Sequence, residues 1–472
     1  MMIRILSVLC FSVALFCAAC GQVAMPEPYG PVPSRQQLEW QKMEYYMFVH
    51  FGPNTFSGVE WGDGSENPDI FNPSSLDCRQ WASTAKAAGM KGIIITAKHH
   101  DGFCLWPSLT STHTVKESSW RRGKGDVLKE LSQACREYGL KFGVYLSPWD
   151  RNHPAYGTPE YNKIFAQALT EVHTAYGPVF EQWFDGACGE EMEFAYDWEL
   201  FIRTVYSHQP NAILFSDVGP GCRWIGNEQG VAGETNWSRL TTDGFTPGKG
   251  APATEILNTG QAGGKYWIPG EADVSIRPGW FYSPDTDSKQ KTVESLMDIY
   301  YTSVGRNANL LLNVPPDRLG RIHGTDSLRL MEFGQAREKA FSRNLARGAR
   351  IYASAVRNPL RMFAPKRMLD GKYDTYWTTD DSVSSACVIV ILKHPEQVEM
   401  LLIQEYIPLG QRINGVTVEC YDTRVGAWVQ TAEATTVGYK RILRFPAILT
   451  DSIRIHLNAR PVCPVINTIE IY

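Results

Sequence analysis

The sequence predicts an α/β protein with a (β/α)8-like TIM barrel followed by a C-terminal antiparallel β-sandwich. From about residue 40 to residue 315, short apolar runs alternate with amphipathic helical segments, which is typical of a parallel barrel. From Ile351 onward the chain instead shows short β-rich runs separated by turn residues. The 472 residues are 43% apolar, enough to bury two separate cores.

The first half of the barrel is expected to contain four consecutive βα units. The expected strands are residues 45–50, 91–97, 141–146 and 179–184. The expected helices between and before them are residues 81–88, 127–138 and 161–176. Strands of this length, each separated by a helical pattern, predict parallel pairing.

The second half is less regular. The predicted elements are a helix at 196–208, strands at 212–215 and 224–226, a helix at 293–303 and a last strand at 309–314. No helix or strand is assigned to a stretch rich in Gly, Pro and Thr at 241–270, so the positions of the sixth and seventh strands are left undecided. A helix at 327–344 then connects the barrel, assigned to 21–350, with a sandwich at 351–472. The clearest strands of the sandwich are 386–392, 415–421 and 452–457.

The N-terminal residues 1–20 have the pattern of an export signal. Arg4 precedes an apolar run too short to span a bilayer, and small residues come directly before Cys20. This pattern predicts either a bacterial lipoprotein anchored through Cys20, in the periplasm or at the outer membrane, or plain secretion.

Charge and cysteine usage exclude several classes of protein. The chain has 46 Lys and Arg against 50 Asp and Glu, so it offers no excess positive charge for nucleic acid. Three of the 11 cysteines lie in the leader, and the other eight are scattered singly without a Cys-x-x-Cys pair. A structural zinc site and a dense disulfide framework are therefore not expected.

Polar residues recur where the barrel strands end. In a parallel barrel these ends open into the active site. The residues are His50, His99, His100, Tyr145, Trp149, Asp185 and Glu228. Three histidines also raise the question of a metal, but the first strand lacks the His-x-His pattern of barrel metallohydrolases, and no metal is assigned.

Asp185 and Glu228 are the candidate catalytic pair. Asp185 follows a buried run whose aromatic residues, Trp183 and Phe184, suit a sugar ring. Retaining glycoside hydrolysis needs one carboxylate as nucleophile and another as acid and base. Asp185 fits the first role and Glu228 the second. Four other acids compete for the second role: Glu60, Glu181, Glu234 and Glu271.

Residues 38–350 resemble the α-L-fucosidases of glycoside hydrolase family 29. The motifs that carry the resemblance are Met47 to Gly52, Glu60-Trp61, Thr96 to Phe103, Gly143 to Ser147, Trp183 to Gly186 and Asn309 to Asn313. The resemblance implies that Asp185 forms a covalent fucosyl-enzyme. It also implies that His50, His99 and His100 bind fucose hydroxyls, with Trp183 and Tyr145 beside them.

The segments 224–229 and 275–282 look like those of the subfamily that prefers α-1,3- and α-1,4-linked fucose on branched, Lewis-type glycans. This likeness implies that Arg277 and Trp280 lie near the pocket and that Arg223 supplies a charged contact to fucose. The expected partner is a fucosylated oligosaccharide or glycoconjugate.

The C-terminal region resembles sandwiches of the galactose-binding or discoidin kind. In those modules the loop that matches residues 369–377 often holds a structural calcium, whereas catalysis itself needs no cofactor. Two alternative functions remain open: an exported glycan-binding protein without catalysis, and a retaining hydrolase for a related sugar such as galactose.

Overall fold

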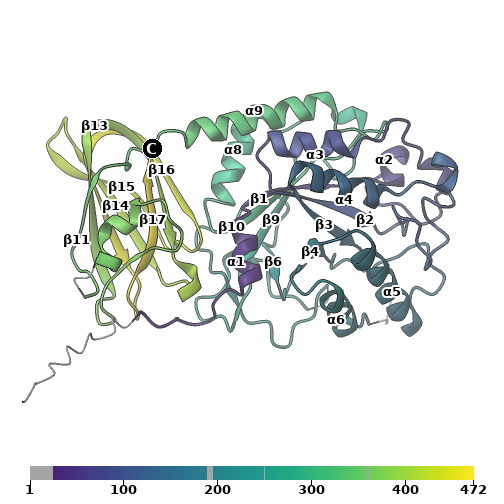
Figure 1. Cartoon of the computed structure of the whole chain (residues 1–472), viewed down its shortest axis with the longest axis horizontal. Helices are drawn as coiled ribbons and strands as arrows, with labels where there is room; N and C mark the ends of the chain where they lie inside the picture. Colours follow the sequence, from purple (N-terminus) through teal and green to yellow (C-terminus); the bar gives the residue numbers. More distant parts are fainter. Residues whose placement is uncertain (1–24, 189–194, 249, 359–360) are drawn as a thin grey trace, which may run out of the picture.

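The computed structural model describes residues 25–188, 195–248, 250–358 and 361–472. The expected export signal and Cys20 lie outside these residues. Figure 1 shows two bodies side by side, a barrel surrounded by helices and a β-sandwich, with the long helix α9 (Gly324–Ala340) running from one toward the other.

Eight parallel strands close the barrel in the order β1-β10-β9-β6-β5-β4-β3-β2. They are β1 Tyr45–Val49, β2 Gly92–Lys98, β3 Lys141–Leu146, β4 Val179–Trp183, β5 Ile213–Ser216, β6 Cys222–Trp224, β9 Gly270–Ser275 and β10 Ala308–Asn313. The helices of this body are α1 Arg35–Gln41, α2 Pro53–Ser57, α3 Cys78–Ala87, α4 Val127–Tyr138, α5 Pro159–Ala175, α6 Trp198–His208, α7 Thr254–Thr259, α8 Val293–Thr302 and α9. The predicted barrel is confirmed, and so are the four βα units of its first half.

The second half departs from a regular barrel at two connections. β5 and β6 are joined by residues 217–221 alone, without a helix. Between β6 and β9 the chain makes a long excursion in which β7 (Arg239–Leu240) and β8 (Tyr266–Trp267) form a two-stranded antiparallel sheet, with α7 between them in the sequence. Strand β9 was not expected from the sequence, because its inward positions carry acids instead of apolar residues.

The barrel interior is packed mainly with aromatic and aliphatic side chains. They include Tyr46, Phe48, Ile94, Tyr145, Trp183, Ile213, Phe215, Cys222 and Leu311. Helix α1 closes the N-terminal end: Gln37 donates hydrogen bonds to the carbonyls of Gly221 and Trp267, and Asn309 donates to the carbonyl of Trp40. The opposite end, where the strands finish, is left for the site.

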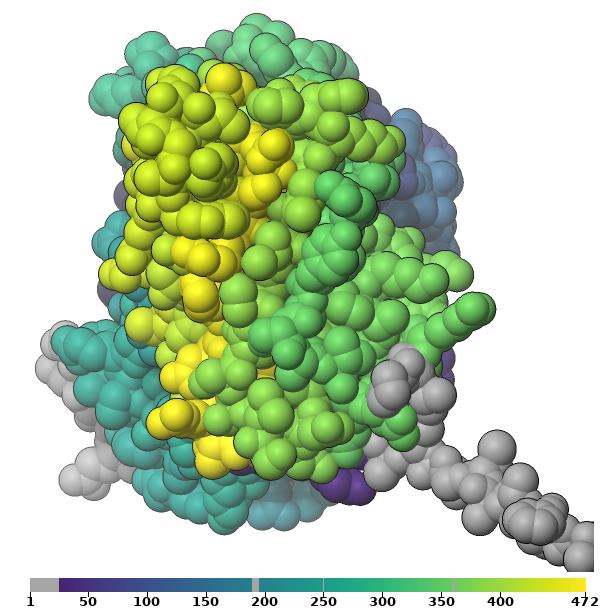
Figure 2. All heavy atoms as spheres, turned by 90° about the vertical axis from the view of Figure 1, so that its left-hand side faces the viewer, coloured from purple at the N-terminus to yellow at the C-terminus, as the bar shows by residue number. Residues whose placement is uncertain are grey.

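The C-terminal body is an antiparallel sandwich, as expected. Its strands are β11 Arg350–Ala353, β12 Trp377–Thr378, β13 Ser385–Glu405, β14 Gly415–Asp422, β15 Ala427–Ala434, β16 Arg441–Asn458 and β17 Val465–Ile471. Strands β13 and β16 pair along most of their lengths with two register shifts, at which the ribbon bends. Figure 2 shows the face of this body that points away from the barrel.

Polar contacts join the sandwich to the barrel. Gln411 donates to the carbonyl of Asn236, the backbone of Tyr439 donates to Asn307, and Lys440 forms an ion pair with Glu44. These residues lie away from the ends of the barrel strands that carry the site, so the contacts buttress the barrel. Among the described helices, none is both long and apolar enough to cross a membrane.

Candidate active site

A cavity of about 540 Å³ lies where the barrel strands end. Its walls include His50, Glu60, Trp61, His99, His100, Tyr145, Trp183, Asp185, Glu228, Asp273 and Trp280. These side chains come from strands β3, β4 and β9 and from the loops that follow β1, β2, β4, β6 and β9. The fold therefore brings together most of the residues that the sequence singled out.

Asp185 is held in a fixed orientation two residues after β4. Its Oδ1 accepts a hydrogen bond of 2.7 Å from the backbone of Ala187, and its Oδ2 accepts one of 2.8 Å from the hydroxyl of Tyr145. The Nε2 of His100 lies 3.7 Å from the same Oδ2, and the Asp185 side chain stays 24% exposed. The carboxylate is thus oriented by donors yet open to the cavity, as a nucleophile must be.

The three histidines are buried and neutral. Burial lowers the pKa of His50 to about 3 and that of His99 well below its ordinary value. Burial also lowers the pKa of His100, although nearby Asp185 opposes this shift. Neutral imidazoles present both a donor and an acceptor nitrogen, which suits hydroxyl groups.

Asn313 fixes the tautomer of His50. The amide nitrogen of Asn313 donates to Ser275 Oγ and to the carbonyl of Trp280, so its Oδ1 must be an acceptor. That Oδ1 lies 2.9 Å from Nδ1 of His50, and the proton therefore sits on Nδ1. The Nε2 of His50 is left with a lone pair for a sugar hydroxyl.

Glu228 stands on a tight loop after β6. Gly226 has a φ of +79°, and a Cβ there would lie 2.6 Å from the carbonyl oxygen of Thr254, so only glycine fits this turn. Burial raises the pKa of Glu228, and the charge of Asp185 adds to the effect, while a hydrogen bond from Trp280 opposes it. A carboxyl group with a raised pKa beside an open carboxylate suits a general acid.

The four competing acids differ in their positions relative to the cavity. Glu60 lines the cavity, but its Oε2 already accepts a 2.7 Å hydrogen bond from the backbone of Trp280. Glu181 and Glu271 are fully buried beneath Trp183. Glu234 is 81% exposed and forms an ion pair with Arg306 outside the cavity. Of the four, only Glu60 remains a geometric rival of Glu228.

Aromatic rings form the floor and rim of the cavity. The Trp280 ring lies 5.1 Å from the His50 ring, and Trp183 stacks on Tyr145 at 5.3 Å. Trp61 is 58% exposed at the rim. Trp149 does not line the cavity itself but packs behind it, 5.8 Å from Trp61 and 4.8 Å from His100.

Two expected substrate contacts lie elsewhere. The guanidinium of Arg223 donates to the carbonyls of Leu257 and Ile268 and to Asn236, and it is fully buried on the outer side of β6. Arg277 forms ion pairs with Asp326 and Asp287. Both arginines therefore stabilise loops around the barrel and do not face the cavity.

Asp273, on β9, is a cavity residue that the sequence reasoning missed. It also lines a neighbouring cavity of about 250 Å³, together with Asp185, Glu228, Asp217 and Trp224. Its Oδ1 accepts a 2.9 Å hydrogen bond from the indole of Trp224, and burial, followed by the charges of Glu228 and Glu271, raises its pKa well above the ordinary value. The polar and apolar alternation from Glu271 to Ser275 is the signal that could have identified this strand.

The loop expected to hold calcium is closed by its own contacts. Both carboxylate oxygens of Asp370 accept hydrogen bonds from Thr375, and they also contact Lys372 and Arg367. A calcium ion would have to displace these donors. The residues in this loop therefore do not fit the ion well.

Comparisons with known proteins identify the family of the chain. A family model described as alpha-L-fucosidase matches residues 28–338. Alpha-L-fucosidase 1 of Arabidopsis thaliana is 42% identical over 451 residues, covering 95% of this chain and 88% of the plant protein. A crystal structure of a glycoside hydrolase family 29 member from an unknown rumen bacterium has 41% identity and a TM-score of 0.83, covering 94% of this chain and 78% of that one.

A further solved structure contains the sugar. The family 29 fucosidase of Ruminococcus gnavus, solved in complex with fucose, has 34% identity and a TM-score of 0.89, covering 96% of this chain and 97% of that one. The family model covers more than half of the chain, and the plant relative matches nearly all of it. The chain therefore belongs to the alpha-L-fucosidases of glycoside hydrolase family 29.

Proposed function

We propose that this fucosidase releases terminal α-L-fucose with retention of configuration, with Asp185 as nucleophile and Glu228 as acid and base. The observation that carries the proposal is the arrangement of Asp185. Its two oxygens are oriented by Tyr145 and the Ala187 backbone, while Glu228 lines the same cavity with a raised pKa caused first by burial. Retaining enzymes place their two carboxyl groups about 5–5.5 Å apart across the scissile bond.

The reaction then proceeds in two displacements. In the first, Asp185 attacks the anomeric carbon while Glu228 gives its proton to the departing glycosidic oxygen. In the second, the Glu228 carboxylate takes a proton from water, the water attacks the same carbon, and the bond to Asp185 breaks. His50, His99 and His100, kept neutral by burial, hold the hydroxyls throughout.

The natural substrate, in this proposal, is fucose linked α-1,3 or α-1,4 on branched, Lewis-type glycans. The sequence around Glu228 and the segment 275–282 support it through their likeness to that subfamily. Trp280 of this segment is at the cavity wall, and Trp61 offers an exposed ring at the rim on which a neighbouring sugar can stack. A digestion panel of α-1,2-, α-1,3- and α-1,4-fucosylated oligosaccharides tests this, and a strong preference for α-1,2 linkages would refute it.

The stereochemical outcome has its own experiment. Proton NMR during hydrolysis of an aryl α-L-fucoside should show α-L-fucose as the first product, before mutarotation. Initial release of β-L-fucose would mean an inverting reaction and would remove Asp185 from the role of nucleophile.

The cellular setting is also a proposal. The pattern in residues 1–20 supports export and lipidation at Cys20. Labelling with a radioactive fatty acid in the producing cell should mark the wild-type protein and leave a Cys20→Ala variant unlabelled, whereas equal labelling of both would refute the anchor.

A further inference from the structure

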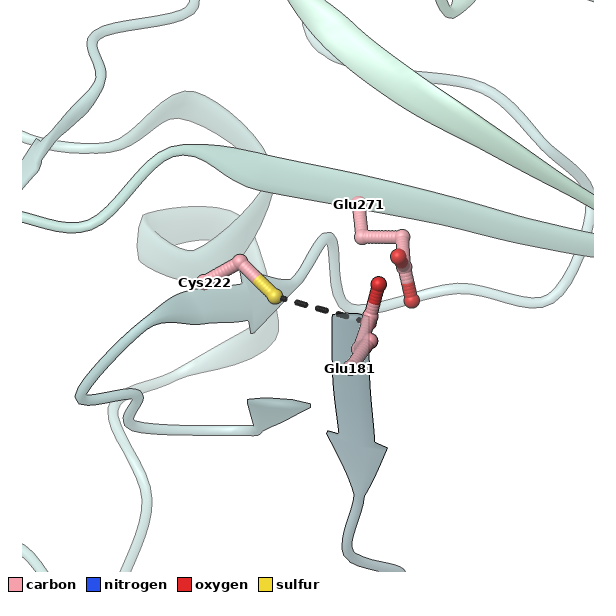
Figure 3. A group of neighbouring side chains, drawn as sticks. All are labelled: Glu181, Cys222 and Glu271. Carbon is pink, nitrogen blue, oxygen red and sulfur yellow. Dashed lines mark hydrogen bonds between the residues drawn. The ribbon is translucent and has the colours of Figure 1, made fainter. Parts of the chain in front are cut away.

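A second pair of carboxyl groups lies deep in the barrel, below the cavity that holds Asp185 and Glu228. Glu181 of β4 and Glu271 of β9 both point into the interior, and both are fully buried (Figure 3). Cys222 of β6 approaches from the side, with its Sγ 3.8 Å from Oε1 of Glu181. Neither acid can reach a substrate, so their cost of burial needs another explanation.

The pair is surrounded by neutral donors. The indole of Trp40 donates to Oε2 of Glu181 at 2.8 Å, the indole of Trp183 donates to Oε1 of Glu271 at 2.8 Å, and the hydroxyl of Tyr46 donates to Oε2 of Glu271. None of these described hydrogen-bond partners carries a positive charge. Two unscreened negative charges at this depth would repel each other strongly, so the two acids share a proton.

The pKa values agree with that geometry. Burial raises the pKa of Glu181 to about 7. Burial, followed by the charge of Glu181, raises the pKa of Glu271 further. The two carboxyl groups hydrogen-bond each other, and the pair retains a proton.

A bound metal explains the cluster less well. The oxygens of Glu181 and Glu271 and the sulfur of Cys222 lie within 4.8 Å of one another, which is a geometry that could hold an ion. However, both carboxyl groups already accept N–H or O–H donors, and an indole N–H cannot turn into a ligand. The N–H and O–H hydrogens that point at the carboxyl groups would repel a cation bound there.

One of the two indoles connects the pair to the catalytic site. Trp183 stacks on Phe215 at 3.9 Å and on Tyr145 at 5.3 Å. Tyr145 in turn donates the 2.8 Å hydrogen bond to Asp185. The other indole, that of Trp40 in α1, lies at the far end of the barrel and packs edge-on against Tyr46 at 6.4 Å.

We propose that Glu271, sharing a proton with Glu181, is a positioning residue: it holds Trp183 against Tyr145 and so aligns the floor of the sugar pocket with Asp185. The inference rests on the roles proposed above for Asp185 and the cavity. It predicts that losing the acceptor at position 271 damages catalysis through Trp183, beyond any effect on folding.

The test uses Glu271→Met, which fills the same space without an acceptor, and Glu271→Gln, which keeps an acceptor for Trp183 and a donor for Glu181. For aryl fucoside hydrolysis, E271M should lower kcat/KM by about tenfold or more, because a buried indole N–H is left unpaired. E271Q should restore most of the activity. Trp40→Phe is the matched control: it removes the equivalent hydrogen bond on the Glu181 side and should lower the melting temperature without changing kcat/KM.

A double variant separates positioning from general stability. In a Trp183→Phe background the N–H is absent, so adding E271M should cost no further activity per folded molecule. Unchanged kcat/KM in folded E271M, equal activity losses in E271M and W40F, or additive losses in E271M/W183F would each overturn the inference. The nucleophile assignment is tested separately by Asp185→Ala, in which retained turnover would refute that assignment without deciding the role of Glu271.

Discussion

Replacing Glu228 by Gln should slow hydrolysis in a way that depends on the leaving group. Glutamine keeps the shape of the side chain but has no proton to give to the departing oxygen. General acid catalysis contributes about 10²–10⁴-fold to the rate, which corresponds to about 2.7–5.4 kcal/mol of transition-state stabilisation. A fucosyl disaccharide, whose leaving alkoxide is a strong base, should lose that whole factor in kcat/KM.

An aryl fucoside with a nitrophenolate leaving group needs little protonation. Its kcat/KM, which reports the first displacement, should therefore fall far less in E228Q than that of the disaccharide. Its kcat should still fall, because the second displacement lacks a base, and added azide should restore it.

Glu60→Gln is the comparison that makes the assay decisive. The Glu60 carboxylate accepts the backbone N–H groups of Trp280 and Phe281, so the amide loses part of that set at a cost of about 1–3 kcal/mol. Trp280 packs against His50, a proposed ligand of the fucose hydroxyls that both substrates share, so both substrates should lose the same factor. If E60Q discriminates between the substrates while E228Q slows both equally, the acid and base assignment is wrong.

Four further outcomes follow from the same geometry. Asp185→Gly should be inactive, and azide should convert an aryl fucoside in that variant to β-L-fucosyl azide. Azide in Glu228→Gly should instead give the α-anomer. NMR distinguishes the two anomers, and reversed products would exchange the roles of the two acids. Because burial keeps His99 neutral, competitive inhibition by fucose should stay constant from about pH 7.5 to about pH 5, and a loss with the ordinary imidazole titration would contradict this. Asp273→Asn should retain activity while Asp273→Ala should not, since burial keeps this carboxyl protonated; equal losses would show an ionised Asp273. The folded pair of Glu181 and Glu271 holds a proton that unfolded glutamates release, so the free energy of unfolding should fall as pH rises from about 4.3 toward 7. The slope should be at most about 1.4 kcal/mol per pH unit and proton. Urea titrations should show a flatter slope for E271Q.

The first half of the barrel was predictable because local and tertiary signals coincide there. Helix α4 and strand β3 have the bounds expected from the sequence, since each apolar stripe faces one continuous core. Strand β9 was not predictable from hydrophobicity, because Glu271 and Asp273 occupy inward positions that are usually apolar. Its acids are tolerated only because donors on other strands satisfy them, and such partners are invisible in a linear sequence.

The same limit explains the misplaced arginines. Adjacent residues of a strand face opposite sides, so Arg223 must point away from the interior once Cys222 and Trp224 point into it. The motif places Arg223 near Glu228 along the chain, but the pleat separates them in space. By contrast Asp185 and His100 were predictable, because residues just beyond parallel strands meet at one end of the barrel whatever their neighbours are.

Depth in the barrel assigns different tasks to chemically similar acids. Glu181 and Glu271 are sealed beneath Trp183, Asp273 is buried at the cavity wall, and Asp185 is open to the cavity. Burial penalises the charged form, so Asp273 retains its proton, the Glu181 and Glu271 pair retains a shared one, and all three act as hydrogen-bonding parts of the scaffold. Asp185 is met by a hydroxyl and an amide that both donate to it, an environment suited to a carboxylate. A nucleophile therefore needs no unusual residue here, only the shallowest inward position and two donors aimed at it.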